Sequence, residues 1–135
     1  MRTRRRMLDK YAKSLEVEPE KITFNAMDEA LLKRAMAIVE KNMDNIEFST
    51  DEFAREMNMS RSNLHLKLKA ITGESTIDFI RKIRFNEAAK LLKDGRYTVA
   101  EVSTMVGFNT PSYFATSFKK YFGCLPTEYI KKSKG

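Results

Sequence analysis

The chain has 135 residues, of which 42% are hydrophobic and 32% are charged, so it can form one folded domain and is not disordered by composition. One cysteine and one histidine exclude an internal disulfide framework and a zinc site built from these residue types. No apolar run reaches the roughly 18 residues of a membrane span, and residues 1–10 lack the apolar segment of a secretory signal. The sequence therefore predicts a soluble, cytoplasmic protein.

Positive charge is concentrated in the last two thirds of the chain. Lysine and arginine number 25 against 18 acidic residues, which gives a formal net charge of +7, and residues 48–135 carry +6 of it. A basic surface of this kind predicts a polyanionic partner. We interpret residues 1–24, with their arginine cluster, as a linker or basic arm, and residues 25–135 as the folded domain.

Apolar spacing and the positions of helix breakers predict an all-α protein. Glycine and proline number only five and three, the glycines fall between or after helical segments, and no stretch alternates as a strand does. Seven helices are expected, over residues 28–43, 50–57, 61–71, 76–93, 99–106, 111–122 and 127–133.

Helix-capping residues precede most of these segments. Asn25 stands before the first helix, and Ser49 and Thr98 each stand three residues before a glutamate, which is the pattern of a capping box. Thr110 precedes a proline at the first helical position. The caps thus agree with the apolar periodicity on where helices begin.

The helix expected over residues 76–93 has two apolar stripes. Phe79 and Ile83 form one stripe, and the other contains Ile77, Ile80, Phe85, Ala88, Leu91 and Leu92. A helix with two apolar stripes can pack against two neighbours, so we interpret it as a rigid spacer. Arg81 and Arg84 fall within the larger stripe, where each would extend to water, pair with a carboxylate or meet a phosphate backbone.

The sequence contains an internal repeat on either side of this spacer. Residues 49–73 resemble residues 98–123, with matching caps, apolar positions and closing glycines. Each copy predicts a short helix, a turn and a second helix, with Asn58 and Gly107 in the turns, where a positive φ is tolerated. Paired amphipathic helices are common, but two matched copies on the basic part of the chain favour helix-turn-helix units over 50–73 and 98–123.

Three segments carry a resemblance to a known family: FAREMNMSRSNLHLKLKAITG, FIRKIRFNEAAKLL and VAEVSTMVGFNTPSYFATSFKKYFGCLPTEY. Over about residues 28–133, the chain resembles the AraC/XylS family of bacterial transcription regulators. The resemblance implies two helix-turn-helix subdomains joined by a long linker helix, with each recognition helix in the major groove of double-stranded DNA. It also implies an activator of transcription, because most members of the family activate.

The upstream segment LEVEPEKITFNAMDEALLKRAMAIVEKNMDN narrows the resemblance. It is similar to the junction before the output domain of hybrid two-component regulators of Bacteroidetes, many of which control polysaccharide use. This implies a C-terminal fragment of a protein that also contains a periplasmic sensor, a histidine kinase and a receiver and is anchored in the inner membrane. RNA polymerase and a second copy, paired through the missing domains, are the implied partners.

Two departures from the family pattern shape the expected DNA contacts. Leu66 and Thr116 stand where the recognition helices usually carry arginine, so we expect the isolated domain to bind DNA weakly. The predicted base contacts are made by Arg61, Ser62, Asn63, His65, Leu66, Ser112, Tyr113 and Thr116. The predicted contacts to the DNA backbone are made by Ser60, Lys67, Lys69, Arg96, Thr110, Lys119 and Lys120.

The sequence offers no glycine-rich phosphate loop, paired carboxylates or Ser/His/Asp set, so it predicts no enzymatic activity, cofactor or small-molecule substrate. Two other functions remain open for a basic helical domain. One is an interaction module that binds RNA polymerase or an acidic protein, and the other is a nonspecific DNA binder. A specific regulator prefers particular sequences of double-stranded DNA, whereas neither of these two functions requires such a preference.

Overall fold

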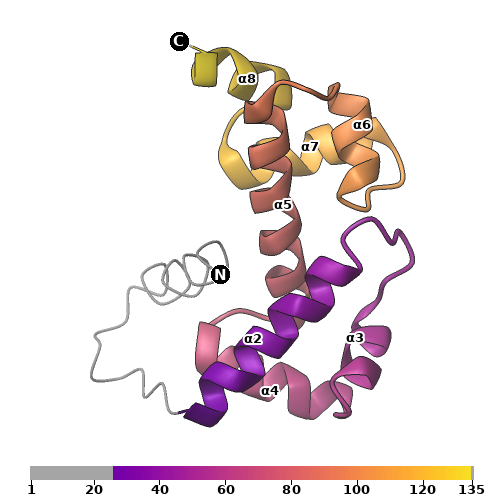
Figure 1. Cartoon of the computed structure of the whole chain (residues 1–135), viewed down its shortest axis with the longest axis vertical. Helices are drawn as coiled ribbons and strands as arrows, with labels where there is room; N and C mark the ends of the chain where they lie inside the picture. Colours follow the sequence, from indigo (N-terminus) through magenta and orange to yellow (C-terminus); the bar gives the residue numbers. More distant parts are fainter. Residues whose placement is uncertain (1–25, 135) are drawn as a thin grey trace. The chain divides into compact units, whose positions relative to one another are not determined.

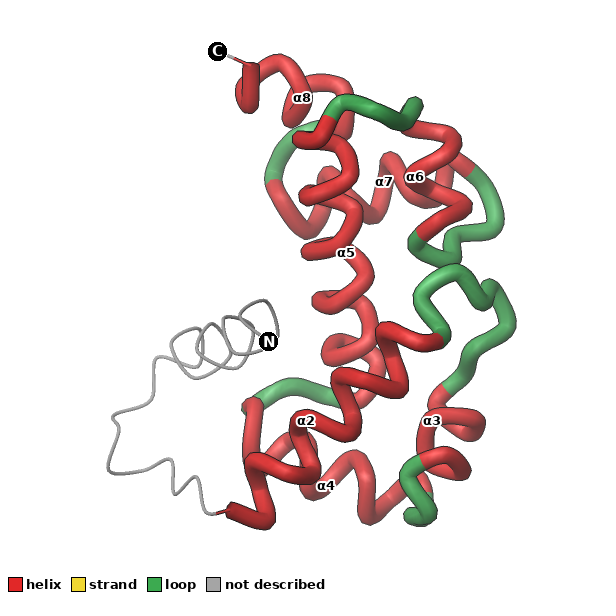
Figure 2. Tube along the Cα trace, in the orientation of Figure 1, coloured by secondary structure: helices red, strands yellow, loops and turns green. Residues whose placement is uncertain are grey.

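The computed structural model describes residues 26–134 of the chain (Figure 1). The predicted arm over residues 1–24 and the predicted cap Asn25 lie outside this range. The described residues form seven α-helices and no strand, which confirms the all-α prediction (Figure 2). Within the same range, no helix is long and apolar enough to cross a membrane.

The helices begin and end close to the predicted residues. They are α2 (Ala26–Lys41), α3 (Thr50–Glu56), α4 (Arg61–Thr72), α5 (Thr76–Asp94), α6 (Val99–Met105), α7 (Pro111–Phe122) and α8 (Pro126–Lys134). The helix predicted over residues 28–43 begins and ends two residues earlier than expected. Helix α3 packs against α4, and α6 packs against α7, so each half of the repeat forms a helical pair.

Contacts divide the described residues into two compact units. The first unit comprises residues 26–39 and 49–80, and the second comprises residues 40–48 and 81–134. Each unit therefore contains one helical pair of the repeat. Helix α5 is continuous through its 19 residues and belongs in part to each unit, which agrees with its prediction as a long linker helix.

Hydroxyl caps begin the helices of the repeat, but only one predicted capping box is complete. Thr98 accepts a hydrogen bond from the N–H of Glu101 at 3.1 Å, and the Glu101 carboxylate accepts from the N–H of Thr98 at 2.8 Å. At Ser49 only the first half forms, because the carboxylate of Glu52 pairs with Arg55 instead. The prediction of a reciprocal box at Ser49 was therefore wrong.

The turns of the two copies have the same backbone design. A hydrogen bond of 3.0 Å from the N–H of Met59 closes the first turn, and one of 2.9 Å from the N–H of Phe108 closes the second. The preceding residues, Asn58 and Gly107, have φ angles of 58° and 81°, as predicted. Asparagine and glycine are the residue types that adopt this left-handed conformation most readily.

The first unit buries the inward face of each of its helices. Its fully buried large side chains come from α2, α3, α4 and α5, and they are Leu32, Met36, Phe53, Leu64, Leu68 and Phe79. The rings of Phe53 and Phe79 are stacked with centroids 6.0 Å apart. One position of the predicted apolar stripe was wrong: Ile77 is 56% exposed, because it belongs to the first turn of α5 and points away from these residues.

An aromatic cluster forms the core of the second unit. Phe85 lies at its centre, with ring centroids of Phe108, Phe114 and Phe118 at 5.4, 6.4 and 6.2 Å. The remaining buried members are Ala88, Leu92, Val102 and Val106. Burying one phenylalanine side chain contributes about 2 kcal/mol, so this cluster fixes which face of α7 is turned inward.

Arg84 is buried in the second unit and reaches neither water, a carboxylate nor the predicted phosphate backbone. Its guanidinium donates to three main-chain carbonyls: Asn42 at 3.2 Å, Asn45 at 2.8 Å and Gly107 at 3.3 Å. These bonds join the segment after α2 to the turn between α6 and α7. The three environments expected for Arg84, namely water, a carboxylate and a phosphate backbone, were therefore wrong. Arg81 is exposed, which agrees with the expectation that its side chain extends to water.

The charge of Arg84 is compensated by dipoles more than by an ion pair. Burial lowers the pKa of the Arg84 guanidinium, and the negative charge of Asp44 opposes this shift. An arginine so placed stays protonated because its ordinary pKa is far above neutral. Carbonyl oxygens that accept from a charged donor make stronger hydrogen bonds than neutral pairs do, which stabilises the buried charge.

We expect Gly107→Ala to destabilise the second unit far more than Gly95→Ala. Both glycines have a positive φ, which costs an alanine about 1 kcal/mol. A Cβ at Gly107 would lie 2.7 Å from Nη1 of Arg84 and from the carbonyl oxygen of Met43, whereas nothing lies within 4 Å at Gly95. The expected losses in free energy of unfolding are about 3 and about 1 kcal/mol.

Urea denaturation followed by far-ultraviolet circular dichroism measures both losses. Equal losses for the two variants would contradict the conclusion that Arg84 and the Met43 carbonyl leave no space at Gly107.

Candidate nucleic-acid interface

Helix α4 turns one face to the core and the opposite face to solvent. Leu64 and Leu68 are fully buried one turn apart and anchor the helix. Ser60 caps its first turn by accepting from the N–H of Asn63 at 3.1 Å. Every predicted contact residue of this segment is exposed: Ser60, Arg61, Ser62, Asn63, His65, Leu66, Lys67 and Lys69.

Helix α7 repeats this arrangement in the second unit. Phe114 and Phe118 are fully buried one turn apart, and Thr110 caps the helix by accepting from the N–H of Tyr113 at 3.1 Å. Pro111 occupies the first helical position, as predicted. The predicted contact residues of this segment are all exposed: Thr110, Ser112, Tyr113, Thr116, Lys119 and Lys120.

Neither recognition helix contains an acidic residue. Helix α4 carries Arg61, Lys67 and Lys69, and α7 carries Lys119 and Lys120. The exposed face of each helix thus combines positive charge with hydroxyl, amide and imidazole groups. Such groups donate and accept hydrogen bonds at base edges, while the cations attract phosphates.

Some of these side chains already have a partner in the free domain. Nε of Arg61 lies 3.0 Å from Oδ1 of Asp51, and Nε of Arg96 lies 3.2 Å from Oδ2 of Asp94. Both ion pairs are solvent-exposed, and exposed pairs contribute little free energy, so the arginines can exchange these partners for a ligand at small cost.

Two exposed side chains of α7 are held in place by contacts within the unit. The hydroxyl group of Thr116 donates to the carbonyl of Ser112 at 3.0 Å, which leaves its oxygen free to accept. The ring of Tyr113 is 56% exposed and rests 5.6 Å from the ring of Phe108. An aromatic side chain supported in this way offers an apolar surface and a phenol group at the start of the helix.

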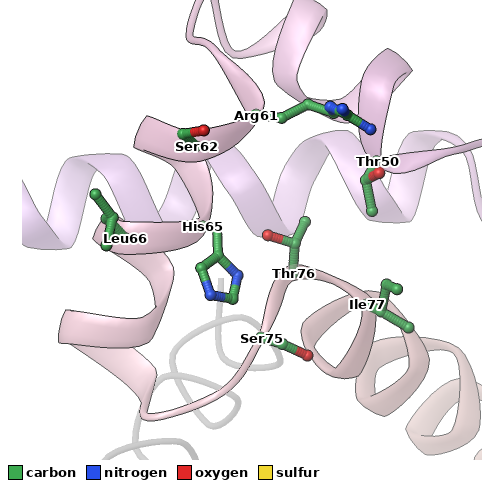
Figure 3. A pocket seen from close by; sticks show the side chains of 8 residues that line it. All are labelled: Thr50, Arg61, Ser62, His65, Leu66, Ser75, Thr76 and Ile77. Carbon is green, nitrogen blue, oxygen red and sulfur yellow. The ribbon is translucent and has the colours of Figure 1, made fainter.

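A hollow of about 550 Å³ borders the exposed face of α4 (Figure 3). Its lining comes from the starts of three helices and comprises Thr50, Arg61, Ser62, His65, Leu66, Ser75, Thr76 and Ile77. The sequence predicted the α4 residues as contacts but missed Thr50, Ser75, Thr76 and Ile77. These residues belong to the starts of α3 and α5, and only folding places them beside α4.

The comparisons with known proteins agree with this geometry. A family model described as a helix-turn-helix domain matches residues 53–132, which is more than half of the chain. The chain belongs to the AraC-type helix-turn-helix family. As a member of that family, it is the DNA-binding domain of a transcription regulator.

Three relatives illustrate the similarity. "Histidine kinase P4" of Formosa agariphila is 37% identical over 129 residues, which are 96% of this chain and 9% of that protein. The transcriptional activator RhaR of Mannheimia succiniciproducens is 31% identical over 62% of this chain and 30% of its own length. The C-terminal domain of AraT, a response regulator from Geobacillus stearothermophilus, is 30% identical with a TM-score of 0.70, covering 76% of this chain and 84% of that structure.

The chain therefore spans only a small part of the full-length relatives that it matches, namely 9% of the first and 30% of the second. The structure solved as a separate C-terminal domain is covered over 84% of its length. The shared unit is thus the helix-turn-helix domain itself.

We expect Asp51→Asn to strengthen DNA binding by about threefold. The substitution removes a negative charge beside α4 and releases Arg61 from its ion pair, so Arg61 becomes available to DNA. Fluorescence anisotropy with a labelled duplex measures the affinity. Since the ion pair is exposed, the free energy of unfolding is expected to change by less than about 1 kcal/mol.

Glu29→Gln provides the matched control. Glu29 also lies in the first turn of a helix, and its carboxylate also pairs with an exposed cation, Lys33, at 3.4 Å. Equal strengthening by both substitutions would assign the effect to net charge alone and would remove Arg61 from the explanation.

Proposed function

We propose that this chain binds double-stranded DNA sequence-specifically and that α4 and α7 read the bases. The observation that carries the proposal is the shared design of the two helices. Each is capped by a hydroxyl, anchored by two buried side chains one turn apart, and free of acidic residues on its exposed face. A recognition helix held in this way presents its first turns to the major groove.

The exposed side chains of α4 support a mixed readout of bases. Arg61 can donate two hydrogen bonds to a guanine, Asn63 can pair with an adenine, and Leu66 can touch a thymine methyl group. Ser62 and His65 can donate or accept. On α7, the corresponding set is smaller and uncharged: Ser112, Tyr113 and Thr116.

Contacts to the sugar–phosphate backbone hold these helices in register. The cations assigned to this task are Lys67, Lys69, Arg96, Lys119 and Lys120, and the helix-capping residues Ser60 and Thr110 lie where N–H groups face outward. Since phosphates carry no sequence information, these contacts determine affinity and its salt dependence.

The whole protein, in this proposal, is a signalling protein of which this domain is the output. Support comes from 37% identity to a protein named as a histidine kinase and from similarity to the C-terminal domain of a response regulator. The kinase then lies outside this domain, in a protein anchored in the inner membrane with the domain in the cytoplasm. The domain acts as an activator, which a relative named as an activator supports, with RNA polymerase as a partner.

Pairing of two copies through the upstream domains completes this proposal. A second linked domain raises the effective concentration of the first at a double site, which compensates for weak binding by one copy. Control of polysaccharide use stays a prediction from the resemblance alone.

Selection from a random duplex library tests the proposal. The protein is incubated with the library at about 150 mM salt, and bound sequences are recovered and compared. A shared motif supports sequence-specific regulation. Recovery of no motif, with binding that disappears as salt rises, would contradict it and favour nonspecific binding, whereas no DNA binding would favour a protein-interaction module.

We expect Ser62→Ala and His65→Ala to change which bases are preferred at one or two positions of the selected motif. Each substitution removes hydrogen bonds to base edges, which are worth about 1–3 kcal/mol of discrimination. Repeating the selection with each variant measures the change. Ser133→Ala, an exposed serine on α8, is the control and should leave the motif unaltered.

We expect Lys119→Ala to weaken binding to all duplexes by a similar factor. A lysine that contacts a phosphate releases a counterion, so the slope of log affinity against log salt should become less steep by about 1. Anisotropy titrations over a series of salt concentrations give this slope. Lys33→Ala, on α2, should leave the slope unchanged, and a loss confined to one sequence would instead make Lys119 a base contact.

A further inference from the structure

One nearly buried residue in the first unit has a hydroxyl group without a hydrogen-bond partner among the described residues. Thr76, the first residue of α5, lines the hollow beside α4 and is only 6% exposed. Within the described part of the chain, its hydroxyl group neither donates nor accepts a hydrogen bond. Figure 3 shows the hydroxyl oxygen on the side of Thr76 that faces His65. The hydroxyl oxygen can be reached from the hollow, so a ligand bound there can provide its hydrogen-bond partner.

The start of α5 adds two main-chain donors at the same place. The first N–H groups of a helix have no partner within the helix. The side chain of Ser75 accepts from the N–H of Asp78 at 3.2 Å, and its carbonyl accepts from the N–H of Phe79 at 2.9 Å. The N–H groups of Thr76 and Ile77 remain without a partner among the described residues. In a helix of 19 residues, this end also carries a partial positive charge that favours an anion.

The rest of the lining combines one arginine with uncharged polar and apolar side chains. Arg61 and His65 project from α4 toward the hollow. Leu66 and Ile77, which are 64% and 56% exposed, form its apolar surface. A phosphate followed by a deoxyribose has the complementary chemistry, because the anion accepts hydrogen bonds and the sugar ring packs against apolar side chains.

We propose that this hollow binds one phosphate and the adjoining deoxyribose of the DNA strand next to the base pairs that α4 reads. The phosphate accepts from the Thr76 hydroxyl and from the N–H groups of Thr76 and Ile77, and the sugar packs against Leu66 and Ile77. This inference rests on the proposed function, because it requires α4 to lie in the major groove. It adds Thr76 and Ile77 to the interface and gives Leu66 a second role.

The substitution Thr76→Val tests the proposal. Valine keeps the shape of threonine and removes only the hydroxyl group, so DNA affinity is expected to fall about fivefold, and by the same factor on every duplex sequence. The melting temperature of the free domain should stay the same or rise, since no internal hydrogen bond is lost. A purely structural threonine would instead lower the melting temperature and leave DNA affinity intact.

Thr72→Val is the matched control in the same unit. The Thr72 side chain is also buried, but its hydroxyl donates to the carbonyl of Leu68 at 2.7 Å and accepts from the N–H of Glu74 at 3.1 Å. This variant should therefore lower the melting temperature and leave the affinity of the folded domain for DNA unchanged, opposite to Thr76→Val.

A duplex with one uncharged methylphosphonate group, moved stepwise along the bound site, identifies the phosphate concerned. At one position, the methylphosphonate should lower the affinity of the wild-type protein about as much as the Thr76→Val substitution lowers affinity for the unmodified duplex. The same methylphosphonate should lower the affinity of the Thr76→Val variant little further. Losses that add at every position would overturn the proposal. The proposal would also be overturned if Thr76→Val abolished the stabilisation of the protein by inorganic phosphate but left its DNA affinity unchanged, because the hollow would then bind a free anion.

The proposed function is tested separately by the selected motif. A wild-type protein that shows no sequence preference overturns the proposed function, and the comparison of Thr76→Val with wild type can still be made on any single duplex. The two failures are therefore distinguishable.

Discussion

The arrangement of both recognition helices depends on burial of their apolar faces. A helix of 12 residues is marginal in water on its own, so α4 and α7 are stable only because they pack against their units. Two leucines anchor α4 and two phenylalanines anchor α7, in each case one turn apart. A 12-residue helix held along one side has little freedom to rotate about its axis. The apolar spacing therefore decides which side chains of each helix are turned toward solvent.

The two units meet the same geometric requirement with different chemistry in their turns. The first turn uses Asn58 in the left-handed region and leaves it exposed. The second uses Gly107, which is buried, because the guanidinium of Arg84 occupies the space that a side chain would need. The carbonyl of Gly107 in turn accepts a hydrogen bond from Arg84, so the turn before α7 and the linker helix share one polar contact. The position of α7 thus depends on a buried charge, and that of α4 does not.

Most of the fold was predictable from the sequence because its signals are local. Helical spacing, hydroxyl caps and the matched turn residues all act over a few residues, and the boundaries they indicate agree with the structure to within about two residues. The exposed faces of α4 and α7 followed from the same spacing. Prediction failed where residues distant in sequence meet. The carbonyl partners of Arg84 come from segments up to 42 residues away, and periodicity carries no information about them.

The same limit explains why the hollow beside α4 was missed. Ile77 fits the apolar stripe of the linker helix when only its spacing is considered, yet the first turn of α5 lies beside α4 and leaves Ile77 exposed. Conversely, nothing in the sequence distinguishes Thr76 from an ordinary helix-starting residue. Its missing hydrogen bond becomes visible only when the surrounding donors and acceptors are counted in three dimensions.

The composition of the interface bears on how such a domain would be controlled. Leu66 and Thr116 stand where the resemblance to the family implies arginine, so the set of contacts that the resemblance implies is smaller here by two charge-assisted bonds. The remaining arginine on α4 is already paired with Asp51. In the proposed function, one copy therefore binds weakly, and occupancy of a double site rises steeply when a second copy is brought alongside. A domain with stronger intrinsic binding would occupy its sites whether or not the copies were paired. Moderate affinity is thus the property that would allow pairing by upstream domains to act as the switch.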